Sequence, residues 1–75
     1  MKLQEFIKLF AVQFDETPVD VFVPTTDYKS LEEWNSLTAL SVIAMVDDDC
    51  QKRITGADLR ACTTVEDLYN LVESK

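Results

Sequence analysis

Glycine is almost absent from this chain, and its absence restricts the folds open to it. Gly56 is the only glycine, and Pro18 and Pro24 are the only prolines, in 75 residues. All-β architectures depend on many tight turns, which glycine and proline supply. The apolar residues recur instead at intervals of three and four, the spacing of an amphipathic α-helix. The sequence therefore predicts an all-α protein.

The size of the chain fits one domain that spans residues 1–75. This length lies near the lower limit at which a single core suffices without disulfides or metals, and 47% of the residues are apolar, as in ordinary globular proteins. No apolar run approaches the roughly 20 residues of a membrane-spanning helix. The acidic, periodically apolar start does not resemble a signal peptide. We therefore expect a monomeric, cytoplasmic protein.

The first predicted helix buries one face and ends before Pro18, because proline disfavours helical geometry in the residue before it. That face consists of Leu3, Phe6, Ile7, Phe10 and Phe14. A long loop over residues 15–35 follows, with a turn at residues 24–27. Its valines alternate as in a strand, but no second strand exists to pair with it. We expect the loop to be anchored by Phe22, Val23, Tyr28, Leu31 and Trp34.

The second predicted helix begins at Asn35 or Ser36 and ends near Asp49. Its expected core face consists of Ala39, Leu40, Val42, Ile43 and Val46. Its expected outward face consists of Leu37, Thr38, Ser41, Ala44 and Met45. This assignment makes the outward side small and mildly apolar.

Two further helices are predicted in the last third of the chain. Thr55 caps a short one that reaches Ala61, and Thr63 with Glu66 has the spacing of a capping box before the last helix. The fold is thus predicted as three main helices and one short helix, with a long loop between the first two. Its core is expected to contain Phe6, Ile7, Phe10, Ile43, Val46, Leu68 and Val72.

The net charge is −7, from fourteen acids against seven bases. Binding to nucleic acid or to anionic membranes requires clustered lysine and arginine, so partners of those kinds are disfavoured. Acidity suits docking on basic patches of other proteins, and it also keeps a small protein in solution. Charge alone does not choose between these two roles.

The chain offers little catalytic chemistry, and we expect no enzyme activity. It has no histidine, which is the commonest general base. Asp47, Asp48 and Asp49 begin a segment that lacks the glycine and glutamate of a calcium-binding loop, where Lys52 and Asp58 stand instead. No dedicated metal site is expected. Cys50 and Cys62 lack metal-type spacing and are expected to be partly buried thiols; the sequence does not exclude a disulfide between them.

Ser36 stands at the predicted start of an apolar helix, where a phosphate group is well accommodated. The unpaired backbone N–H groups and the positive end of the helix dipole favour an anion there. Serine and asparagine are also ordinary capping residues, so Asn35 and Ser36 have a purely structural interpretation as well. The tripeptide Asn35-Ser36-Leu37 by itself is a weak motif.

A wider pattern resembles the acyl carrier protein family. Asn35-Ser36-Leu37 is similar to its Asp-Ser-Leu attachment motif, and residues 24–34 resemble the loop that leads to it. Thr64-Val65-Glu66-Asp67-Leu68 resembles the Thr-Val-x-Asp-Leu start of the family's last helix. The resemblance covers nearly the whole chain and is best from residue 24 to residue 72. Asn35 departs from the family's usual aspartate.

The resemblance implies a carrier with a covalent 4'-phosphopantetheine arm on Ser36 and Asn35 as the flanking residue. A phosphopantetheinyl transferase would attach the arm, and acyl- or aminoacyl-loading and -transferring enzymes would be the further partners. Docking is expected on the second helix, through Leu37, Ser41, Met45, Asp47 and Asp48. Because the early part of that helix lacks acids usual in fatty-acid carriers, a specialised carrier is indicated. The alternative is a carrier-like adaptor that is never modified.

Overall fold

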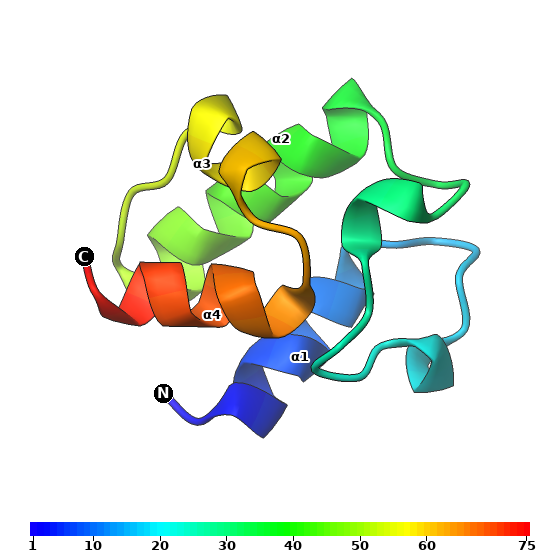
Figure 1. Cartoon of the computed structure of the whole chain (residues 1–75), viewed down its shortest axis with the longest axis horizontal. Coiled ribbons are helices and arrows are strands. Elements are labelled where there is room, and N and C mark those ends of the chain that lie inside the picture. Colours follow the sequence, from blue (N-terminus) through cyan, green and yellow to red (C-terminus); the bar gives the residue numbers. More distant parts are fainter.

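A computed structural model describes all residues from 1 to 75 and shows a small bundle of four helices without strands (Figure 1). The helices are α1 (Leu3–Val12), α2 (Ser36–Met45), α3 (Gly56–Ala61) and α4 (Val65–Glu73). The predicted all-α fold, with three main helices, one short helix and a long loop between the first two, is confirmed. No helix combines the length and the apolar character needed to cross a membrane.

The core lies where α1, α2 and α4 meet. Figure 1 shows α4 lying beside α1, with α2 above them and α3 in front of α2. All the predicted core residues are buried except Ile43, which is half-buried and packs against the core. The fully buried side chains that fill most of the interior are Phe6, Phe10, Tyr28, Val42, Val46, Val65, Leu68 and Val72. Aromatic rings dominate the end of the core under the long loop.

The long loop is held down by aromatic side chains and contains two short 3₁₀ turns, Val19–Val21 and Tyr28–Ser30. Phe22 and Tyr28 are buried as predicted, and both rings pack on Phe10 at centroid distances of 5.9 and 5.4 Å. Val23 was expected to be an anchor and is instead exposed. The reason is local: Phe22 turns inward, and the next residue of an extended segment then points outward.

Helix α2 begins at Ser36 as predicted and continues beyond Met45 as a π-helical turn, Val46–Cys50. The turn ends at Gln51, which has left-handed backbone geometry (φ 55°) and donates its N–H to the carbonyl of Val46. The predicted end near Asp49 is therefore close to the last helical residue. Residues 47–49 point their carboxylates into solvent at this end.

Capping boxes set the starts of α3 and α4. Thr55 accepts from the N–H of Asp58, and the Asp58 carboxylate accepts from the N–H of Thr55, as the sequence predicts for the short helix. The capping box predicted for Thr63 and Glu66 is wrong by one residue, because Thr64 and Asp67 form it. Val65, the first residue of α4, is buried in the core.

Candidate functional site

Ser36 is the first residue of α2 and is exposed to solvent. Asn35, also exposed, caps the helix: its Oδ1 accepts from the N–H of Thr38 at 3.0 Å and lies 3.3 Å from the Thr38 hydroxyl oxygen. This bond satisfies one of the unpaired donors of the first turn. The start of the helix is thus fixed by Asn35, and the neighbouring serine hydroxyl remains free to carry a group.

The chain segment before Ser36 is anchored by two aromatic side chains, the half-buried Trp34 and the buried Tyr28. Trp34 stacks near Phe14 at a centroid distance of 6.3 Å and meets the edge of Tyr28 at 4.9 Å. The Tyr28 hydroxyl donates to the carbonyl of Leu59 at 2.7 Å and so ties the loop to α3. These contacts hold α3 beside the start of α2.

Glu33 makes a second anchor that sequence reasoning missed. Its carboxylate accepts from the backbone N–H groups of Asp15, Glu16 and Thr17 and from the Thr17 hydroxyl, at 2.6–3.1 Å. The hydroxyl of Thr17 and the three N–H groups lower the pKa of the Glu33 carboxyl. Periodicity and capping motifs do not indicate a contact between residues that are 16–18 positions apart in the sequence. It ties the end of the loop, three residues before Ser36, to the segment that follows α1.

The outward face of α2 differs from the predicted one. Leu37 and Leu40 are 75% and 61% exposed, and Ser41 and Ala44 lie exposed beside them. Leu40 had been assigned to the core, and that assignment is wrong. The outward face of α2 thus consists of Leu37, Leu40, Ser41 and Ala44.

Met45 and Thr38 had been assigned to that outward face and are buried, at 4% and 8% exposure. Met45 therefore offers no surface to a partner of the folded protein, so the structure contradicts its place in the expected docking set. The Thr38 hydroxyl is satisfied inside by donating to the carbonyl of Glu33 at 2.8 Å. The helix is rotated so that Val42, Met45 and Val46 face the core.

The acidic end of α2 lies next to a shallow depression. Asp47 lines the depression together with Leu40, Ala44 and Arg53, and its volume is about 440 Å³. Asp47 and Asp48 are exposed, and neither makes an ion pair. The outward face of α2 thus runs from an apolar half near Ser36 to an acidic half at the π-helical turn.

A second groove, of about 320 Å³, opens beside Ser36 itself. Its walls come from α2, from α3 and from the residues just before α2: Trp34, Asn35, Ser36, Ala39, Gly56, Leu59 and Arg60. Sequence reasoning identified Ser36 and Asn35 but missed Arg60. The only available signal was that Arg60 is the sole basic residue between positions 54 and 74.

The remaining candidate groups do not assemble into a metal centre. No three histidine, cysteine, aspartate or glutamate side chains gather in an arrangement that could hold a metal ion. Cys50 and Cys62 are free thiols, half-buried and buried respectively. Burial raises the pKa of both thiols, and nearby carboxylates raise it further. Neither cysteine lines the groove beside Ser36.

Comparison of the chain with family models, with curated proteins and with solved structures finds no match.

Proposed function

We propose that this chain is a carrier protein that bears a 4'-phosphopantetheine arm on Ser36. It would present a thioester-bound acyl or aminoacyl group to partner enzymes and would have no catalytic activity of its own. The observation that carries the proposal is the exposed hydroxyl of Ser36 on the first turn of α2, next to a groove and on a rigidly anchored segment. The resemblance of residues 24–72 to acyl carrier proteins supports it.

The residues around Ser36 fit a phosphate-linked arm. The serine is exposed, so a transferase can reach its hydroxyl. The groove beside it is lined by no carboxylate that would repel a phosphate, and helix starts favour anions. The thiol of the arm supplies the thioester chemistry, while the protein orients the arm and is recognised by partners.

The outward face of α2 is the proposed docking surface, with Leu37 and Ser41 retained from the sequence prediction and Leu40 added. Leu37 and Leu40 are large apolar side chains left exposed beside the attachment point, as is common at interaction sites. Asp47 and Asp48 extend the surface with negative charge, which favours partners with basic rims. Changing Asp47 and Asp48 together to asparagine should slow partner association and weaken its dependence on salt. An unchanged rate would remove the electrostatic part of this proposal.

Modification of Ser36 is tested by incubating the purified protein with coenzyme A, magnesium and a broad-specificity transferase. Intact-mass measurement should show the addition of one phosphopantetheine group. Ser36→Ala should abolish the addition, and Ser74→Ala, which removes an exposed serine at the end of α4, should leave it unchanged. Addition to Ser36→Ala would refute the assignment of the attachment site.

Asn35 is expected to slow the modification without preventing it. Loss of a charge-assisted contact costs about 1.5–3 kcal/mol, roughly a ten- to hundredfold change in binding. Asparagine and aspartate are nearly isosteric and both cap helices, so Asn35→Asp keeps the geometry and restores the charge. We expect Asn35→Asp to accept the arm faster than the native chain.

One observation favours the alternative, an unmodified adaptor. The side chain of Asn35 is engaged in capping α2, so its presence has a structural explanation that does not require a transferase. The exposed Leu37 and Leu40 would then serve only to bind a partner protein. If neither the native protein nor Asn35→Asp accepted the arm from several transferases, the adaptor would become the better proposal.

A further inference from the structure

Arg60 is the only charged residue that lines the groove beside Ser36. The chain as a whole has twice as many acids as bases, yet no acidic side chain contributes to this groove. A groove with one cation and no anion is therefore unlike the general character of the chain. The feature matters because the groove adjoins the one hydroxyl proposed to carry a phosphate.

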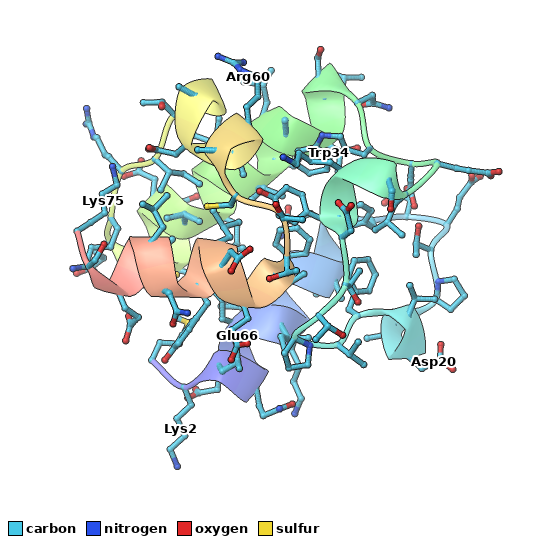
Figure 2. The ribbon with its side chains drawn as sticks, in the orientation of Figure 1. Lys2, Asp20, Trp34, Arg60, Glu66 and Lys75 are labelled. Atoms are coloured by element: carbon cyan, nitrogen blue, oxygen red, sulfur yellow. The ribbon has the colours of Figure 1, made fainter.

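The guanidinium of Arg60 lies over the first residue of α3. Its Nη1 lies 3.3 Å from the position that a Cβ on Gly56 would occupy, and Gly56 itself lines the groove. Arg60 and Trp34 both line the groove, and Figure 2 shows both in the upper half of the view. The Arg60 side chain thus lies along α3 from its last turn to Gly56, and both residues line the groove.

The guanidinium has no partner within the protein. The two ion pairs of the structure join Lys75 to Asp58 and the amino group of Met1 to Glu73. Arg60 takes part in side-chain hydrogen bonding only through its backbone carbonyl, which accepts from the Nζ of Lys29 at 2.8 Å. A second cation therefore lies close to Arg60. The donors of the guanidinium remain free, and their fork-like arrangement suits the oxygens of a phosphate.

We propose that Arg60 is a positioning residue that binds a phosphate ester carried on Ser36. The inference rests on the proposed modification of Ser36 and specifies how its first phosphate would be held. Arg60 would draw that phosphate toward α3, so that the arm leaves the serine along the groove instead of projecting freely into solvent. Asn35, being neutral, places no competing negative charge next to the serine.

The electrostatic part is testable without a transferase. Phosphoserine incorporated at position 36 by genetic encoding provides a phosphate ester whose second pKa, ordinarily near 6, can be followed by phosphorus NMR. We expect that pKa to be roughly 0.2–0.7 unit lower in the protein with Arg60 than in Arg60→Gln, the range of exposed ion pairs. The difference should shrink at high salt. The backbone N–H groups of α2 act equally in both proteins and cancel.

Arg53→Gln is the matched control, because Arg53 lines the other depression, at the far end of α2. It should change the pKa of the phosphoserine much less than Arg60→Gln, and Arg60→Lys should retain part of the native value. Equal pKa values in the native and Arg60→Gln proteins at low salt would overturn the proposal. An effect of Arg53→Gln as large as that of Arg60→Gln would also overturn it, since only net charge would then matter.

The arm itself is tested on protein loaded with phosphopantetheine. Loading should raise the thermal unfolding midpoint of the native protein more than that of Arg60→Gln, whereas the two unloaded proteins should unfold at similar temperatures because Arg60 is exposed. Equal effects of loading would overturn the role of Arg60 toward the arm. Absence of any loading would instead contradict the proposed function, and the phosphoserine titration would still decide whether Arg60 binds a phosphate ester at Ser36.

Discussion

Tyr28 is the residue whose removal tests most directly how the loop and α3 are held together. Its side chain is completely buried, and its hydroxyl donates to the carbonyl of Leu59, with the carbonyl of Cys62 at 3.4 Å. The Leu59 carbonyl is among the last four of α3, which have no partner inside the helix. Tyr28→Phe keeps the ring that packs on Phe10 and Trp34 and removes only the hydroxyl.

The expected cost of Tyr28→Phe follows from two contributions. A typical hydrogen bond contributes about 1 kcal/mol net, and a buried acceptor left without a donor costs about 1–3 kcal/mol. Because the ring contacts are preserved, we expect a loss of about 2 kcal/mol in the free energy of unfolding. For a domain of this size that corresponds to a fall of roughly 8–16 °C in Tm.

Urea and thermal unfolding followed by far-ultraviolet circular dichroism measure this loss. Tyr69→Phe is the matched control, because it makes the same chemical change at a half-buried position whose hydroxyl bonds at the surface. Tyr69→Phe should change Tm much less than Tyr28→Phe. If the two variants lost equal stability, or if Tyr28→Phe lost less than about 0.5 kcal/mol, the buried bond to α3 would not hold the loop as argued.

Alkaline pH gives an independent measurement on the same residue. Burial, assisted by the nearby Cys62, Asp67 and Asp27, raises the pKa of Tyr28 well above its ordinary value of 10.0. Above pH 10 the unfolded chain therefore releases this proton while the folded protein retains it, so stability falls as pH rises. The slope contributed by one such group is at most about 1.4 kcal/mol per pH unit. Tyr28→Phe should make the decline above pH 10 shallower, and an unchanged slope would contradict the assignment.

Four other results are expected. Hydrogen bonds lower the pKa of the Glu33, Asp58 and Asp67 carboxyls below their ordinary values of 4.5, 3.8 and 3.8. The stability that these carboxylates contribute is therefore complete above about pH 5 and is lost as pH falls. In an acid titration of unfolding, Glu33→Gln should lose stability less steeply than the native protein. Leu68→Ala should cost about 2–5 kcal/mol in the core, whereas Leu40→Ala on the surface should stay within about 0.5 kcal/mol; chemical denaturation distinguishes a surface Leu40 from a buried one. Gln51→Gly should stabilise the protein by about 0.5 kcal/mol, because glycine adopts a positive φ without steric cost; a loss of stability would contradict that backbone geometry. Alkylation of Cys50 and Cys62 at pH 8 should be slower in the folded than in the urea-unfolded protein, because their raised pKa values reduce the thiolate fraction; equal rates measured by mass spectrometry would refute this.

Some features of this protein can be predicted from short stretches of its sequence. The stripe from Leu3 to Phe14 predicted α1, and Thr55 with Asp58 predicted the start of α3, since helical spacing and capping depend on residues three or four apart. The position of Ser36 at a helix start was predicted for the same reason. These interactions close within one or two turns of helix, so the sequence contains all that is needed to recognise them.

Capping at α4 shows the limit of local reasoning. Thr63 with Glu66 and Thr64 with Asp67 both have the spacing of a capping box, and the structure shows that Thr64 and Asp67 form it. The rotation of α2 was ambiguous for a similar reason. Apolar or small residues surround that helix on all sides, so periodicity gave no single core face, and Leu40 and Met45 were exchanged.

By itself, the sequence determined that the chain is helical, where α2 and α3 begin, and that a serine stands at the start of α2. The tertiary structure alone decided which side of α2 faces outward and which residues anchor the long loop to the core. It also showed that Glu33 binds the segment after α1, and it brought Arg60 and Ser36 to the same groove. These features join residues 16 or more positions apart, or depend on how whole helices share one core, and such contacts leave no periodic signal in the chain.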